Sequence, residues 1–143
     1  MNVETILRTK GRNVVTVAPN ATVTMAAALL RRHGIGALVV SRDGAAIEGI
    51  LSERDIVHGL AEHGAAALDY EVGRLMSRRV VTSKAGDSIA ELMSLMTERR
   101  IRHIPVVEHG RLAGIVSIGD VVKNRLDEVE SEASSMREFI AGA

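Results

Sequence analysis

The chain has 143 residues, of which 18 are basic and 18 acidic, so it is long enough for one average domain or two small ones and has no net charge at neutral pH. Neutrality argues against a general nucleic-acid binder, because such binding depends on clustered cations, and an aromatic content of 1% leaves little on which unpaired bases could stack. The lack of cysteine excludes disulfides, thiolate metal sites and thiol catalysis, and it is typical of a reducing compartment.

The N-terminal segment shows no targeting signal. Residues 1–8 have neither the basic start nor the apolar core of a secretory signal, and no apolar run approaches the length that spans a membrane. We therefore expect a soluble, cytoplasmic protein without a membrane partner.

The same series of elements is predicted twice along the chain. Each copy begins with a short helical turn that has one apolar edge, formed by Val3, Ile6 and Leu7 in the first copy and by Val72, Leu75 and Met76 in the second. A strand, a helix and two strands joined by a Gly-bearing turn come next. In the first copy the strands are predicted at residues 14–17, 35–40 and 47–52, and the helix begins at residue 22. In the second copy the strands are predicted at residues 80–83, 101–107 and 112–117, and the helix begins at residue 88. Each copy then ends in a helix.

The first long helix of each copy is amphipathic, and the two apolar faces correspond residue by residue. The faces consist of Val23, Ala26, Ala27 and Leu30 in the first copy and, 66 positions later, of Ile89, Leu92, Met93 and Met96 in the second. Ser88 and Glu91 have the spacing of a capping box, whereas the first copy has only Thr22 at this point. Neither copy has enough apolar surface for a comfortable core alone, so we expect the two to pack together.

A Ser-x-x-Asp turn is the most distinctive repeated feature. Residues 49–57, GILSERDIV, match residues 114–122, GIVSIGDVV, position for position, and Asp55 and Asp120 are 65 residues apart. Such a turn fits an N-cap serine with an acidic residue in the first helical turn, which is a purely structural role. It also suits a ligand, because a carboxylate accepts hydrogen bonds from a cis-diol and a helix start offers amide donors to a phosphate.

These repeated motifs resemble the CBS domain, a tandem module first described in cystathionine β-synthase and also found in inosine monophosphate dehydrogenase. The resemblance rests on residues 49–55, on residues 114–120 and on the run RHIPVV at residues 102–107. It implies an α+β fold in which two βαββα units pack face to face with pseudo-two-fold symmetry. We place the first unit at residues 1–68, the second unit at residues 69–127 and a C-terminal helical tail at residues 128–143.

The resemblance also implies a regulatory module that binds an adenosine-containing ligand, such as AMP, ADP, ATP or NAD(H), between the units. In the family the motif serine meets phosphate or ribose oxygens, and the motif aspartate accepts hydrogen bonds from ribose hydroxyls. Here these residues are Ser52 with Asp55, and Ser117 with Asp120. Backbone groups of the first two strands read the base, which in this chain implies positions Thr16, Ala37, Thr82, His103 and Pro105.

The two expected half-sites differ in their basic residues. Arg54 lies in the first motif, whereas Arg102 and His103 have no basic counterparts in the first copy. Because arginine presents a planar fork of donors to phosphate, we expect Arg54 to serve one site and Arg102 with His103 the other. The alternative is that the arginines are solvated surface charges and the histidine is structural. Arg99 and Arg100 are expected only to complement a helix dipole.

The last predicted helix carries a heptad-like apolar stripe. The stripe consists of Val122, Leu126, Val129, Ala133, Met136 and Ile140, spaced four, three, four, three and four residues apart. It packs either on the chain's own core or on another subunit. Because CBS pairs commonly associate as dimers, the resemblance implies a homodimer in which this tail is a candidate to extend the contact.

Little in the sequence points to other chemistry. His58 and His63 are five residues apart, which is off a shared helical face, and no zinc motif, Walker loop or nucleophile elbow is visible. We therefore expect a sensor that is not an enzyme, requires no cofactor and passes ligand occupancy to an unidentified protein partner or to its own assembly. The alternative is a structural dimerisation module with no physiological ligand.

Overall fold

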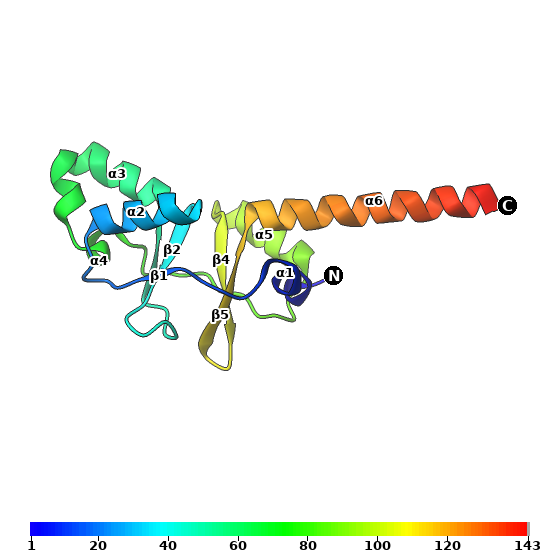
Figure 1. The fold of residues 1–143 in the computed structure, drawn as a ribbon, viewed down its shortest axis with the longest axis horizontal. Coiled ribbons are helices and arrows are strands. Elements are labelled where there is room, and N and C mark those ends of the chain that lie inside the picture. Colours follow the sequence, from blue (N-terminus) through cyan, green and yellow to red (C-terminus); the bar gives the residue numbers. More distant parts are fainter. Residues whose placement is uncertain (143) are drawn as a thin grey trace.

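The computed structural model describes residues 1–142 as two units that meet along their sheets, with one long helix projecting from the second (Figure 1). Its elements in chain order are α1 (Val3–Lys10), β1 (Thr16–Val17), α2 (Val23–His33), β2 (Ala37–Val40), β3 (Gly49–Ser52), α3 (Glu53–His63), the 3-10 helix η1 (Gly64–Asp69), α4 (Val72–Leu75), α5 (Ile89–Arg99), β4 (His103–Glu108), β5 (Arg111–Ser117) and α6 (Ile118–Gly142). The predicted α+β class, with two repeated units and a C-terminal helix, is confirmed. Ala143, the end of the predicted tail, lies outside the described residues.

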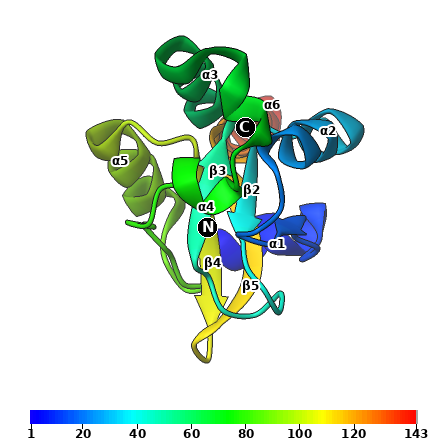
Figure 2. The same cartoon turned by 90° about the vertical axis from the view of Figure 1, so that its left-hand side faces the viewer.

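Two small sheets form the middle of the molecule. β1 pairs parallel with β2 and β2 antiparallel with β3, whereas β4 and β5 form an antiparallel hairpin. Figure 1 shows α2, α3 and α4 outside the first sheet and α1 and α5 outside the second, and Figure 2 shows the strands in the centre with the helices around them. Each Ser-x-x-Asp turn therefore lies where the last strand of a unit passes into a helix, at β3–α3 and β5–α6.

The strand predicted at residues 80–83 is reduced to a single bridge, so that prediction was wrong in extent. The Ser83 N–H donates to the Pro105 carbonyl at 2.9 Å, and the Ser83 carbonyl accepts from the Val107 N–H at 2.8 Å. The next bond of a parallel ladder would need an N–H on Pro105, which proline lacks. The first unit has Val39 at the matching position of β2, and β1 forms a regular ladder there.

Each unit has its own hydrophobic core, and each core contains a short helix from the other copy of the repeat. The second core is formed by Val3, Ile6, Leu7, Ile89, Leu92, Met96, Ile104, Val106, Val116 and Val121. The first core is formed by Val17, Val23, Ala26, Leu30, Leu38, Val40, Leu51, Ile56, Val72 and Met76. The exchange of α1 and α4 ties the two units together, and the predicted boundary at residue 68 stays a prediction.

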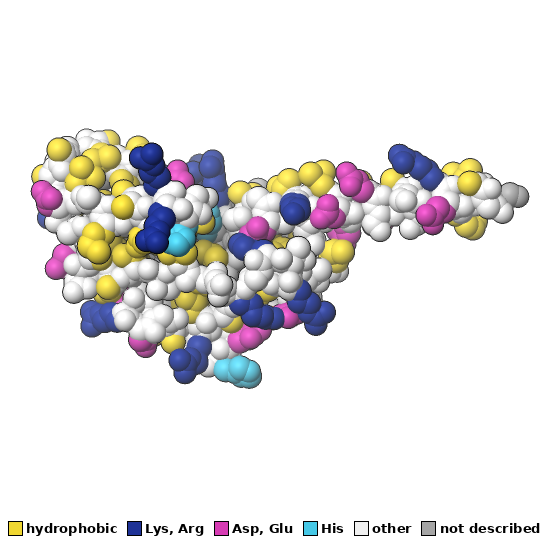
Figure 3. Space-filling model, viewed as in Figure 1, with side chains coloured by type: hydrophobic (Ala, Val, Ile, Leu, Met, Phe, Trp, Pro, Cys, Tyr) yellow, Lys and Arg dark blue, Asp and Glu magenta, His cyan; other side chains and the backbone are white. Residues whose placement is uncertain are grey.

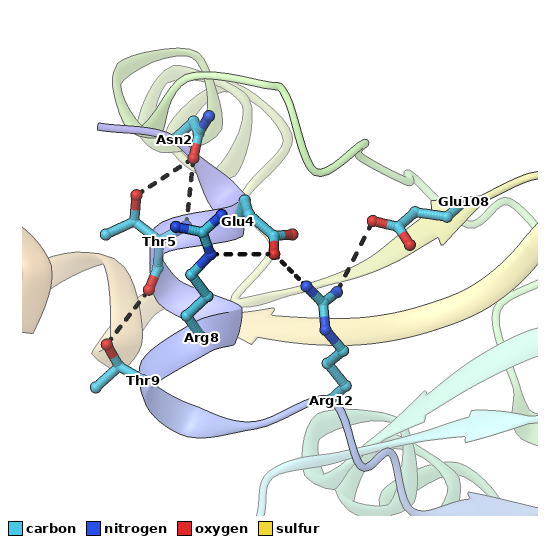
Figure 4. Close-up of polar contacts among 7 residues, drawn as sticks. All are labelled: Asn2, Glu4, Thr5, Arg8, Thr9, Arg12 and Glu108. Carbon is cyan, nitrogen blue, oxygen red and sulfur yellow. Dashed lines mark hydrogen bonds and ion pairs between the residues drawn. The ribbon is translucent and has the colours of Figure 1, made fainter.

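Polar contacts also hold α1 against the second unit (Figure 4). Asn2 caps the helix by accepting from the Thr5 N–H, and Arg12 lies between Glu4 of α1 and Glu108 of β4, 3.8 Å from the Glu108 carboxylate. Exposed ion pairs of this kind contribute roughly 0–1 kcal/mol each. Burial of the apolar edge therefore provides most of the attachment of α1.

The helix caps largely follow the sequence predictions. Thr22 begins α2, and Ser88 begins α5 by accepting from the Glu91 N–H at 3.1 Å, which is one half of the predicted capping box. Both halves of a capping box are present at Ser52 and Asp55 instead. The serine that begins α3 thus has a structural role whatever else it does.

Candidate functional site

A cleft between the two units contains the first Ser-x-x-Asp turn. It encloses about 300 Å³, which is the lower end of the range for small-molecule sites. The lining consists of Gly36, Ile50, Ser52, Glu53, Arg54, Asp55, Ser77, Arg79, Val80, Val81, Arg100, Ile101, Arg102 and His103. Five of the predicted site residues, Ser52, Arg54, Asp55, Arg102 and His103, are therefore brought together here.

In the first turn the structural role uses only one carboxylate oxygen. The Asp55 N–H donates to Ser52 Oγ at 3.3 Å, and the Ser52 N–H and hydroxyl donate to Asp55 Oδ2 at 2.8 and 3.0 Å. Within residues 1–142 no hydrogen bond reaches Asp55 Oδ1. The turn therefore caps α3 and still retains an acceptor on a residue that lines the cleft.

The second turn has the same geometry and a different neighbour. The Ser117 N–H donates to Asp120 Oδ2 at 2.9 Å, and the Asp120 N–H donates to Ser117 Oγ at 3.2 Å. Lys10, the last residue of α1, donates from Nζ to Asp120 Oδ2 at 2.6 Å and to the Ile115 carbonyl at 3.0 Å. Because α1 is exchanged onto the second unit, its lysine forms an ion pair with the carboxylate of the second motif.

The Lys10 contact also sets the charge state of Asp120. Burial by itself raises the pKa of Asp120, but the hydrogen bonds from Lys10 and the Ser117 N–H, together with the Lys10 charge, hold that pKa below its usual range. Asp120 is therefore ionised at neutral pH, and its charge is balanced within the chain. The two motifs share the Ser-x-x-Asp pattern, but only the second aspartate is paired with a lysine.

Four arginines line the cleft at the first turn. Arg54 and Arg102, which we expected to serve different sites, lie in the same cleft. Arg100, expected only to complement a helix dipole, and Arg79, not singled out in the sequence, join them. Against the two acidic residues of the lining they leave an excess of positive charge, which suits a phosphate-bearing ligand.

The repeat itself contains the signal that could have identified Arg79 and Lys10. The shift of 69 residues that takes Val3 to Val72 also takes Lys10 to Arg79. A basic residue thus follows the apolar edge in both copies, and helix exchange brings each one to the other copy's motif. Lys10 forms a hydrogen bond with Asp120 of the second motif. Within the described part of the chain, no hydrogen bond joins Arg79 to Ser52 or Asp55 of the first motif.

His103 lies in the cleft, partly buried, beside Gly36. A Cβ added to Gly36 would lie 3.1 Å from His103 Cε1 and 3.2 Å from Glu53 Oε1, so glycine keeps this wall open. Burial, followed by the positive charge of Lys10, lowers the pKa of His103, although Glu53 opposes this. The imidazole is therefore mainly neutral at pH 7, and an approaching anion would favour its protonation.

Six predicted site residues lie outside this cleft: Thr16 in β1, Ala37 in β2, Thr82, Pro105 in β4, and Ser117 and Asp120 at the second turn. Ala37 is the strand partner of Ser52, and His103 is the partner of Ser117, so each pair lies beside a motif turn. Thr82 is exposed and Pro105 is buried. Their ligand roles stay predictions.

Replacing Arg100 by glycine is expected to raise the stability of the fold and to lower its affinity for a ligand. Arg100 ends α5 with a left-handed φ of 54°, where the first unit has Gly34. Because a side chain in this conformation is strained, Arg100→Gly should raise the free energy of unfolding by up to about 1 kcal/mol in urea titrations and also weaken binding of a phosphate-bearing ligand in the cleft. Arg99→Gly, at the last residue of the helix, should instead lower stability, by less than about 1 kcal/mol. Unchanged affinity in the Arg100 variant would remove this residue from the site.

The repeat in this chain is the CBS domain. The family model for the CBS domain matches residues 3–62 and again residues 72–127. The chain therefore belongs to the CBS family and carries the domain in two tandem copies.

Individual relatives have the same organisation. The CBS-domain containing protein ATU1752 from Agrobacterium tumefaciens is 46% identical, with a TM-score of 0.83 over 87% of this chain and 98% of that one. CBS domain-containing protein YhcV of Bacillus subtilis is 33% identical over 86% of each chain. The CBS domain pair of protein MJ0100, solved in complex with 5′-methylthioadenosine and S-adenosyl-L-methionine, is 25% identical, with a TM-score of 0.77 over 86% of this chain and 98% of that one.

No helix within residues 1–142 is long and apolar enough to cross a membrane. The same residues contain no group of three or more His, Asp or Glu side chains placed to hold a metal ion.

Proposed function

We propose that this chain is a regulatory module that binds a phosphate-bearing adenosine ligand, such as AMP, ADP, ATP or NAD(H), in the cleft between its units. The observation that carries the proposal is the meeting of the Asp55 carboxylate with four arginines in one cleft. A carboxylate with an unused oxygen suits ribose hydroxyls, and guanidinium groups suit phosphates. The role is regulatory and not catalytic, and it requires no cofactor.

The position of the cleft supports a regulatory role, because both units contribute to its walls. A ligand bound there contacts the start of α3 and the segment that precedes β4, so binding favours the arrangement in which both fit it. A coupling free energy of roughly 1–3 kcal/mol is typical of such linkage. The occupancy is read by a protein partner or by the chain's own association into a homodimer.

The ligands of one relative support the adenosine class. The MJ0100 complex contains 5′-methylthioadenosine and S-adenosyl-L-methionine, neither of which carries a phosphate. The excess of arginine in the present cleft favours an anion over the sulfonium cation of S-adenosylmethionine. We therefore propose that phosphate-bearing ligands are the physiological ones here.

Calorimetry and thermal unfolding with AMP, ADP, ATP, NAD(H) and S-adenosylmethionine test this proposal. At least one phosphate-bearing compound should bind at least tenfold more tightly than S-adenosylmethionine. At a hundred times its dissociation constant it should stabilise the protein by about 2.7 kcal/mol. Tighter binding of S-adenosylmethionine would contradict the preference for phosphate, and a flat response to every compound would contradict ligand binding itself.

A structural dimerisation module with no physiological ligand is the second candidate. The apolar side chains exposed along α6 favour it, because such a surface is typical of an interface between chains. Self-association combined with a flat ligand response would support this candidate over the sensor.

A further inference from the structure

The C-terminal helix α6 extends well beyond the body of the molecule. Its first turns pack on α5, β5 and α1, and Val121 is its buried residue. Every described residue after Glu128 is exposed, and Figure 1 shows the helix projecting alone from the second unit. A helical segment of 14 solvent-exposed residues has only marginal stability by itself. We therefore expect a partner to stabilise this part of α6.

The exposed part of α6 carries a continuous apolar stripe. Its large members are 45–66% exposed, and Figure 3 shows hydrophobic side chains along the projecting helix. The stripe consists of Val122, Leu126, Val129, Ala133, Met136 and Ile140. The alternating spacing of four and three residues is that of the a and d positions of a two-stranded coiled coil, with Leu126, Ala133 and Ile140 at a. The stripe therefore fits a second helix that has the same repeat.

Charges beside the stripe identify both the partner and its direction. With Leu126 at a, the g positions hold Arg125, Glu132 and Phe139, and the e positions hold Lys123, Glu130 and Arg137. In a parallel pair, each g residue faces the e residue five positions later on the other helix. Arg125 then meets Glu130 of the second copy, and Glu132 meets Arg137, so both kinds of pair are attractive. In the single chain Arg125 pairs with Glu128 at 3.0 Å, an exposed contact that it can exchange.

The antiparallel alternative places like charges together. When two copies overlap along the whole stripe in opposite directions, e positions face e positions and g positions face g positions. Glu130 then faces Glu130 of the second copy, Glu132 faces Glu132, and Lys123 faces Arg137, so the two charges in each pair have the same sign. Like charges held at these distances are destabilising.

We propose that α6 forms a parallel, in-register coiled coil with a second copy of this chain. The coil spans fewer than three heptads, so it is weak alone and acts together with contacts between the globular units. The two bodies then lie at the same end of the coil, with their second units adjacent. This inference rests on the self-association proposed above and is independent of ligand binding.

Sedimentation equilibrium of the full chain tests the interface. The double substitution Leu126→Glu with Met136→Glu should weaken self-association at least tenfold, because it puts charges into the seam. Ser131→Glu, with the same change on the outer face of the helix, should leave it unchanged. Circular dichroism checks that both variants fold, as expected for exposed positions. A wild-type chain that stays monomeric overturns self-association itself, whereas a dimer that tolerates the double substitution overturns only the role of α6.

Disulfide trapping tests the direction, and the chain has no native cysteine to interfere. In a parallel coil Ile140→Cys lies beside the same residue of the second copy, so mild oxidation should give covalent dimers. In an antiparallel coil the two sulfurs would be roughly 25 Å apart at 1.5 Å per residue, and no crosslink would form. Ser131→Cys, on the outer face, should stay uncrosslinked. A dimer in which the Ile140 variant does not crosslink overturns the parallel arrangement. Equal crosslinking at residue 131 would show random collision and overturn it as well.

Discussion

Replacing Asp55 by asparagine is expected to weaken binding of a phosphate-bearing adenosine ligand about 10- to 100-fold and to leave the fold nearly unchanged. Asparagine keeps an oxygen that can accept from the Ser52 N–H, so the cap of α3 survives. It loses the negative charge, and a hydrogen bond to a charged group contributes about 1.5–3 kcal/mol. Calorimetric titration measures the affinity, and urea denaturation verifies that stability changes by no more than a few tenths of a kcal/mol.

Asp120→Asn is the matched control, and it should show the opposite balance. Its carboxylate already accepts from Lys10 at 2.6 Å, so a smaller change in affinity, less than about threefold, is expected. Stability should fall by about 1 kcal/mol, because a partly buried ion pair is broken. Since folding lowers the pKa of Asp120, this stability is present above its unfolded pKa and is lost as pH falls through the folded value. Equal losses of affinity in the two variants would contradict the choice of the first cleft.

Replacing Leu7 by alanine is expected to lower the free energy of unfolding by about 2–5 kcal/mol. Leu7 lies on the short N-terminal helix, only 1% exposed, and packs directly against Gly114 of β5. The truncation leaves a cavity in the second core, where β5 and α5 have little freedom to collapse into it. This is a large share of the 5–15 kcal/mol typical of a folded domain. Chemical denaturation measures the loss.

Hydrogen exchange would locate the effect of the Leu7 substitution. Amides of β4 and β5 should lose protection first, and amides of β2 should retain it, because α1 packs in the second core. Arg8→Ala, at a side chain that is 77% exposed, should change stability by less than about 0.5 kcal/mol. Loss of protection mainly in β2 would contradict the exchange of α1 between units.

The elements and the repeat could be read from the sequence because they follow from local chemistry. Apolar residues at helical spacing decide which face of α2 and α5 is buried, and both faces were predicted. The strand predicted at residues 80–83 is reduced most, because Pro105, which is distant in sequence, lacks the N–H that the ladder needs. The length of such a ladder depends on the residues of both paired strands, so it cannot be predicted from one strand alone.

The candidate site could be predicted only in part. The duplicated Ser-x-x-Asp turns identified Ser52 and Asp55, because a repeated polar motif between a strand and a helix is conspicuous in sequence. Arg79 and Arg100 were missed, since a single arginine in a sequence looks like any solvated charge. The division of Arg54 and Arg102 between two sites was expected, and the structure places both in one cleft.

The sequence alone was enough to predict a tandem CBS pair, its two motif turns and an apolar stripe on the last helix, because each of these is a local or repeated pattern. Which motif carboxylate is paired with a lysine depends on the tertiary structure. The apolar edges of α1 and α4 could bury equally well on either sheet, and their exchange brings Lys10 to Asp120, 110 residues away. The hydrophobic effect is non-directional, so it does not specify on which of two similar sheets a short apolar helix packs. That depends on the detailed packing of the whole chain.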